Sequence, residues 1–113
     1  MADRTVTVYV SPPDNLCVDQ DPLDCGKRPD HDMDIKWQID TKGWEFTRNG
    51  IVFKDNDDGT FHTPKSGNHE FHWSNMNLIE RLYHYTVNVI STDGNNTRLS
   101  LDPAIHNHGN SLG

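Results

Sequence analysis

The sequence predicts an all-β fold, a single antiparallel β-sandwich of about seven short strands. Apolar and polar residues alternate over short runs, as they do in strands with one buried face. Gly, Pro, Asn and Asp separate these runs at short intervals. Only one short segment has a helical pattern, and it spans about one turn. Because 113 residues suffice for one compact domain and are too few for two, we assign residues 1–113 to one domain.

The first predicted strand is TVTVYV, residues 5–10, in which three valines share one face. Pro12 and Pro13 end it, because proline cannot donate a backbone hydrogen bond. Residues 14–34 then contain seven aspartates, two basic residues and few apolar ones. We predict that this segment is a long acidic surface loop. Loops of this length are uncommon in compact domains and are often functional.

The next predicted strand, residues 34–40, has the most regular alternation in the chain and places Trp37 on its apolar face. Residues 44–48 and 51–55 are predicted as two strands joined at Asn49-Gly50. This dipeptide favours a tight hairpin, because both residues tolerate the positive φ of a type I′ turn.

The second half of the chain predicts one short helical turn among further strands. Residues 69–73 alternate as a strand, and residues 75–82 wind for about a turn, with Asn77 as the cap and Glu80 three residues later. Residues 82–91 form a central strand with its tyrosines and valines on one face. Residues 97–101 and the segment from Ala104 complete the sheets.

The stretch LIERLYHYTVNV, residues 78–89, resembles the approach to the penultimate strand of immunoglobulin-like and fibronectin-like sandwiches. This resemblance implies an immunoglobulin-like β-sandwich with Trp37 in its core. It also implies that Tyr83 is the tyrosine-corner residue, whose hydroxyl bonds to upstream backbone. The chain departs from true immunoglobulin domains in lacking their two core cysteines. Its ending, DPAIHN, resembles the closing strand of small bacterial sandwich proteins, a likeness that implies fold and not function.

The charge of the chain limits its partners. The formal net charge of -7 repels nucleic-acid phosphates and anionic membrane surfaces, so we expect neither as a partner. The first residues lack the apolar core and cleavage site of a secretory signal, which predicts a cytoplasmic protein, or a secreted one if a leader has been removed. In the cytoplasm we expect Cys17 and Cys25 to be reduced thiols.

The preferred functional prediction is a non-catalytic module that binds a protein partner or another copy of itself. No nucleophile motif or nucleotide-binding glycine pattern is present, and only a deep pocket that holds Glu70, His72 and another titratable group would indicate an enzyme. We expect contact through the sheet edges or the acidic loop, without a cofactor. The predicted loop contacts are Asp19, Asp21, Asp24, Asp30 and Asp32.

Two alternatives remain open. His106 and His108 stand at the spacing that places both side chains on one side of a strand, where they can bind Zn²⁺ or Cu²⁺. Their third ligand would be His62, His69 or, as our choice, His72. The third reading is a carbohydrate-binding module. It requires Trp44 to be exposed, so that its ring can stack on a sugar.

Overall fold

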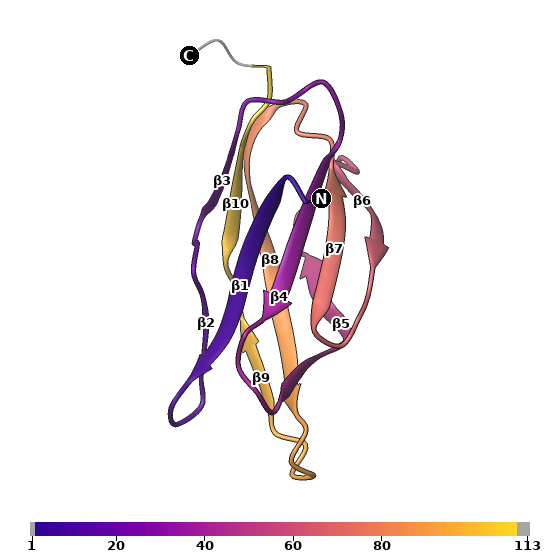
Figure 1. The fold of residues 1–113 in the computed structure, drawn as a ribbon. Helices are drawn as coiled ribbons and strands as arrows, with labels where there is room; N and C mark the ends of the chain where they lie inside the picture. Colours follow the sequence, from indigo (N-terminus) through magenta and orange to yellow (C-terminus); the bar gives the residue numbers. More distant parts are fainter. Residues whose placement is uncertain (1, 111–113) are drawn as a thin grey trace.

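Two β-sheets face each other across one hydrophobic core in the computed structural model of the chain, which describes residues 2–110 (Figure 1). The first sheet has the strand order β2–β1–β4–β7–β6. Its strands are β1 (Arg4–Ser11), β2 (Asn15–Val18), β4 (Met33–Ile39), β6 (Phe61–Lys65) and β7 (Glu70–Asn75). The second sheet has the order β3–β10–β8–β5, and β9 also pairs with β8. Its strands are β3 (Leu23–Gly26), β5 (Trp44–Phe53), β8 (Glu80–Ser91), β9 (Arg98–Leu101) and β10 (Ala104–His108).

The all-β prediction is confirmed, but the strand count and the wholly antiparallel pairing are wrong. The described residues form ten strands instead of about seven. Two of the strand pairs are parallel, β1 with β4 and β3 with β10. Parallel neighbours need a connection that runs from the end of one strand back to the start of the other. A hairpin turn has a recognisable local sequence, whereas such a connection has none.

The acidic segment, residues 14–34, is not a single loop. It contains β2, β3 and the start of β4, and it buries four apolar side chains in the core, those of Leu16, Leu23, Cys25 and Met33. β2 is an edge of the first sheet and β3 is an edge of the second. The segment therefore crosses from one sheet to the other. The signal that we missed is the alternation of Leu23 and Cys25 with polar neighbours. It is weak because β2 and β3 have only four residues each.

The hairpin predicted at Asn49-Gly50 is a bulge within one long strand. β5 runs from Trp44 to Phe53, and its register against β8 shifts between Phe46 and Ile51. A Cβ atom on Gly50 would lie 2.7 Å from Cβ of Phe46, which is too close for any side chain. Gly50 is thus required because the backbone approaches the Phe46 side chain closely inside the bulge. We predicted that it serves a hairpin turn, which is the other common reason for a glycine between two apolar runs.

The helical turn predicted for residues 75–82 is also wrong, and residues 2–110 contain no helix. Asn77 has a φ of 49° and is completely buried, so it does not act as a helix cap. β8 begins at Glu80. Among the described residues there is accordingly no helix of the length and apolarity needed to cross a lipid bilayer.

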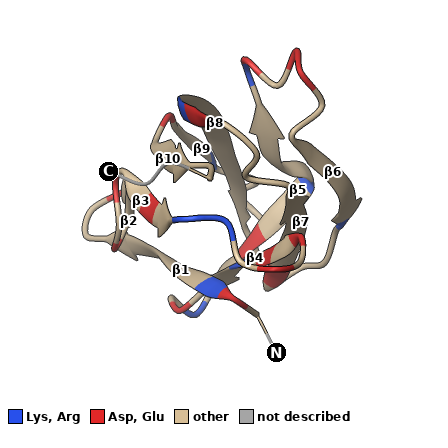
Figure 2. Ribbon diagram, turned by 90° about the horizontal axis from the view of Figure 1, so that it is seen from above, with Lys and Arg blue, Asp and Glu red and all other residues tan. Residues whose placement is uncertain are grey.

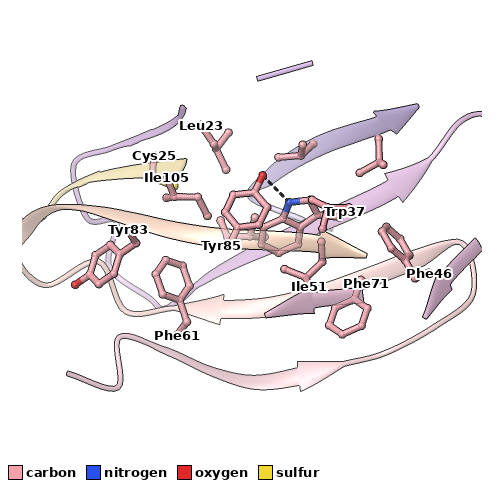
Figure 3. Packing of buried hydrophobic residues seen from close by; sticks show 14 of the residues in the cluster. Leu23, Cys25, Trp37, Phe46, Ile51, Phe61, Phe71, Tyr83, Tyr85 and Ile105 are labelled. Atoms are coloured by element: carbon pink, nitrogen blue, oxygen red, sulfur yellow. Dashed lines mark hydrogen bonds between the residues drawn. The ribbon is translucent and has the colours of Figure 1, made fainter. Parts of the chain in front are cut away.

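Trp37 and Tyr85 meet at the centre of the core. Both are fully buried, and the indole nitrogen of Trp37 donates a 3.1 Å hydrogen bond to the Tyr85 hydroxyl (Figure 3). Burial raises the pKa of Tyr85, so the phenol stays neutral and can accept this bond. The alternation predicted for residues 82–91 is confirmed, since Tyr83, Val87 and Val89 are buried on the same face of β8.

Tyr83 is buried, but its hydroxyl does not bond to upstream backbone as the tyrosine-corner resemblance implies. The hydroxyl lies 2.9 Å from Oγ1 of Thr60 and donates a 2.7 Å hydrogen bond to Oδ2 of Asp58. Both partners are side chains in the segment that precedes β6. Tyr83 therefore anchors that loop to β8.

The two cysteines are free thiols in different environments. Cys17 on β2 is partly exposed, whereas Cys25 on β3 is buried in the core. Burial raises the pKa of the Cys25 thiol to about 12. Since the thiolate is the reactive form, the two residues should differ strongly in reactivity.

We predict that a thiol reagent such as dithionitrobenzoate modifies only Cys17 in the native protein at pH 8, and both cysteines in denaturant. Mass spectrometry of the native protein should show one adduct on the peptide that contains Cys17. The variant Cys17→Ser should then be inert until it is unfolded. Equal labelling of both cysteines in the native protein would contradict the burial of Cys25.

Candidate functional site

Two histidines point outward from the same strand near the end of the chain. On β10, Ile105 and Asn107 are fully buried, while His106 and His108 are partly exposed on the outer face of the second sheet. The centroids of the two imidazole rings lie 4.2 Å apart. The predicted juxtaposition of His106 and His108 on one side of a strand is therefore present.

Glu80, at the start of β8, completes a cluster of three side chains. It is the register partner of His108 across the antiparallel pair of β8 and β10. One ligand atom from each of Glu80, His106 and His108 lies within 4.8 Å of the others, and Nε2 of His106 is 3.6 Å from Oε2 of Glu80. Ligand atoms around a tetrahedral zinc ion are about 3.4 Å apart. Side-chain rotations that move the ligand atoms by roughly 1 Å would bring the three atoms to that separation.

Asp24 of β3 borders this cluster. Its Oδ1 lies 2.9 Å from Nε2 of His108 and also accepts a hydrogen bond from the backbone of Gly26. The Gly26 bond and the neighbouring His108 hold the pKa of Asp24 below its usual range. The contact with His108 lacks the geometry of a hydrogen bond, so Nε2 of His108 is a buried nitrogen without a hydrogen-bond partner among residues 2–110. A buried polar atom of this kind is rare and needs an explanation.

Buried asparagines hold β10 in the orientation that exposes these histidines. Asn107, between the two histidines, exchanges two hydrogen bonds of 2.8 and 2.9 Å with Asn75 of β7 in the opposite sheet. Asn77 accepts a bond from the backbone nitrogen of Gly109, just after β10. All three asparagines are fully buried. This network joins the two sheets beside the cluster and fixes which face of β10 is outward.

The histidines that we predicted as third ligands lie elsewhere. His72, our choice, is on β7 of the first sheet, where its Nδ1 is 3.0 Å from Asp34. His62 on β6 is bonded to Asp32, and His69 is exposed before β7. In the structure Glu80, and not His72, lies beside His106 and His108. Glu80 was missed because its place opposite His108 depends on the register of β8 and β10, which local sequence does not encode.

A hollow of about 310 Å³ surrounds His72 on the outer face of the first sheet and is lined by Asp34, Thr63, Lys65, His72 and Ser74. Nε2 of His72 is 3.8 Å from Oε2 of Glu70, as expected for side chains on the same face of a strand. This nitrogen makes no hydrogen bond to a hydroxyl within residues 2–110. Of the residues that we associated with an enzyme, His72 lines this hollow together with two further titratable groups, Asp34 and Lys65, and Glu70 lies beside His72.

Most of the aspartates predicted as loop contacts support the backbone. Asp19 accepts a hydrogen bond from the backbone nitrogen of Thr7, and Asp21 accepts one from that of Ala104. Asp32 bonds to Arg28 and His62. In Figure 2 the acidic residues are spread over both sheets and several loops instead of gathering in one segment.

Asp30 remains the most exposed of the five predicted contacts, with 99% of its side chain accessible. It lies 2.9 Å from Nδ1 of His31, whose Nε2 is 2.9 Å from Asp3. These two carboxylates raise the pKa of His31.

Trp44, the residue that the carbohydrate prediction needs to be exposed, is partly buried and packs against the core, as does Trp73. The indole nitrogen of Trp73 donates a hydrogen bond to the backbone oxygen of Ile51. Trp37 is fully buried. The tryptophans thus serve chiefly to pack the two sheets together.

No protein-family model matches the chain, and no curated protein shows significant similarity to it.

We predict that His31 links stability to pH. A histidine whose pKa is raised by folding stabilises the native state fully below its unfolded pKa of about 6.5, and this contribution is lost as the pH rises through the folded pKa. His31→Gln should therefore lower the urea midpoint at pH 5.5 and leave it unchanged at pH 9. In an NMR titration, the pKa of His31 should fall in Asp3→Asn. A pKa that does not respond to Asp3→Asn would contradict the proposed contact.

Proposed function

We propose that the protein binds a divalent transition-metal ion, Zn²⁺ or Cu²⁺, through Glu80, His106 and His108. The observation that carries this proposal is the close approach of these three side chains on the outer face of β8 and β10. The buried Nε2 of His108 supports it, because its 2.9 Å contact with Asp24 does not have hydrogen-bond geometry and coordination would satisfy that atom.

The donor set favours these ions over others. Two imidazoles and one carboxylate are ligands of Zn²⁺ and Cu²⁺, whereas Ca²⁺ and Mg²⁺ prefer oxygen ligands only. Three protein ligands leave a fourth position on a tetrahedral ion. The carboxylate of Asp24 lies 2.9 Å from Nε2 of His108, so Asp24 would serve as the fourth ligand.

We predict that Zn²⁺ binds with a measurable heat and raises the melting temperature of the protein. An ion that binds only the native state adds about 2.7 kcal/mol at a free concentration 100 times its dissociation constant. His106→Ala and His108→Ala should each weaken binding by about 100-fold or more, since even outer-shell changes weaken it 10- to 100-fold. Calorimetry and thermal melts measure both effects.

His69→Ala is the matched control, because His69 is exposed and lies outside the cluster. It should bind Zn²⁺ as the parent does, and Mg²⁺ should give no heat with either protein. If Zn²⁺ at millimolar concentration gives neither heat nor a shift in melting temperature, the metal site does not exist.

The protein-binding role is a second proposal, with a basic segment of another protein as the partner. Its support is the placement of the acidic segment, residues 14–34, at an edge of each sheet, where edge strands offer unpaired backbone groups. The carboxylates there repel a second copy of the same edge and attract a basic chain. We also propose that the fold is related to immunoglobulin-like sandwiches. The burial of Trp37 and Tyr83 between the two sheets supports this.

We predict that neutralising three aspartates of this segment weakens binding of a lysine-rich peptide and reduces its salt dependence. The variant is Asp19→Asn/Asp21→Asn/Asp24→Asn, in which each amide oxygen still accepts the backbone bond. The control, Asp40→Asn/Asp93→Asn/Asp102→Asn, has the same net charge. Equal weakening in both variants, measured by fluorescence anisotropy, would show that only total charge matters and would remove the segment from the interface.

A further inference from the structure

A wide hollow lies on the outer face of the second sheet, away from the histidine cluster. It has a volume of about 510 Å³ and continues into a second hollow of about 280 Å³ that shares Thr47, Asn49 and Arg98 with it. The two lie over β5, β8 and β9. We name them together the β5–β9 groove. Along β8, its residues 88–90 are roughly 26 Å from Glu80, so the groove and the candidate metal site are separate.

Strand register explains which side chains meet in the groove. Glu45, Ile90 and Arg98 form one row across β5, β8 and β9, and all three are outward because their strand neighbours Phe46 and Val89 are buried. The next outward row contains Asn88 and Ser100. Ser100 donates a 2.7 Å hydrogen bond to Oδ1 of Asn88.

The β5 bulge supplies the remaining wall. The amide of Asn88 donates a 2.8 Å hydrogen bond to the backbone oxygen of Asn49, which ties the bulge to β8. Gly50 lets the backbone pack tightly against Phe46. The three residues before Gly50 therefore bulge out beside the groove and line it; these are Thr47, Arg48 and Asn49. The groove is therefore a structural consequence of the bulge, and its lining is held by a hydrogen-bond network.

Two arginines of the groove have no side-chain partner among the residues that the structure describes. The chain has five arginines. Three of them, Arg4, Arg28 and Arg81, donate hydrogen bonds within the chain. Arg48 and Arg98 donate none and form no ion pair within residues 2–110, although the chain has seventeen acidic residues. On the same face, Asp102 is paired with Lys54 and Thr86, so its carboxylate is already engaged.

We propose that the β5–β9 groove binds an acidic saccharide, a uronic-acid oligosaccharide, with the guanidinium groups of Arg48 and Arg98 on its carboxylates. Guanidinium groups make the strongest and most directional hydrogen bonds to carboxylates. The rest of the lining consists largely of amides and hydroxyls, those of Thr47, Asn49, Asn68, Asn88 and Ser100. These groups match the hydroxyls of sugar rings.

The size and the polarity of the groove select this ligand class. A volume of about 510 Å³ is within the range of sites for whole small molecules and exceeds what one inorganic anion fills. Apolar contact is limited to Phe46 and Ile90 in the larger hollow, and no tryptophan lines either one. Phe46, the aromatic residue of the lining, is only 4% exposed, so the groove offers little ring surface on which neutral sugars stack. Its recognition depends on charge and hydrogen bonds.

Glu45 is the one acidic residue in the groove. It lies two strands from Arg98 in the same row, about 9.6 Å away between backbones, and the two side chains form no ion pair within residues 2–110. Its carboxylate can accept hydrogen bonds from sugar hydroxyls, but its charge opposes an anionic ligand. Removing that charge should strengthen binding of a carboxylated sugar.

NMR titration with trigalacturonate tests the proposal, with galactotriose as the neutral probe and triglutamate as a peptide of similar charge. Trigalacturonate should shift the amide signals of residues 45–50, 88–90 and 98–100, and its affinity should fall with added salt. Arg48→Ala and Arg98→Ala should each weaken it by about tenfold or more. Glu45→Gln should strengthen it.

The control variant, Lys27→Ala/Lys42→Ala, removes two exposed positive charges outside the groove and should keep the affinity within about twofold, since only distant, screened charges are lost. The proposal is overturned if millimolar trigalacturonate produces no shifts, or if the control weakens binding as much as Arg48→Ala/Arg98→Ala. Equal affinity for triglutamate would overturn the saccharide assignment, and equal affinity for galactotriose would overturn the role of the arginines.

Discussion

The amide pair between Asn75 and Asn107 is the constraint on which the candidate metal site depends. Each side chain satisfies the other inside the core, where a lone amide would be costly, so the pair fixes Asn107 inward and joins the two sheets. Side chains alternate along a strand, and His106 and His108 must then point outward together. The register of β10 against β8 brings Glu80 to the same place. A polar contact in the core thereby determines the chemistry of the surface.

The outer face of the second sheet has two ends of opposite chemical character, and β8 is long enough to serve both. Near its start, Glu80, the two histidines and Asp24 gather nitrogen and carboxylate ligands. Near its end, Asn88 and Ile90 form the floor of a groove with two arginines that have no partner within residues 2–110. The two proposed ligands, a cation and an anion, would thus bind to different parts of one sheet, although the chain as a whole is strongly acidic.

Much of that acidity has a structural use. Carboxylates accept hydrogen bonds from backbone nitrogens at strand edges and turns, as Asp3 does for Asp34, Asp55 for His84 and Asp58 for Thr60. Such bonds satisfy donors that the sheet ladders leave unpaired. This explains why the seven aspartates of residues 14–34 are spread over strands and turns instead of forming one continuous loop.

The sequence by itself determined the class of the fold and its core. Alternation was sufficient to place Trp37, Tyr85 and Val87 inside, and the spacing of His106 and His108 was sufficient to place them on one side of a strand, because both inferences depend only on the two-residue period of a strand. Tertiary structure decided the rest. Four features depend on which distant strands are neighbours and in what register they pair. They are the parallel strand pairs, the bulge at Gly50, the burial of the Cys25 side chain and the position of Glu80. Pairing of this kind is set by the packing of the whole core, and a local stretch of sequence contains no record of it.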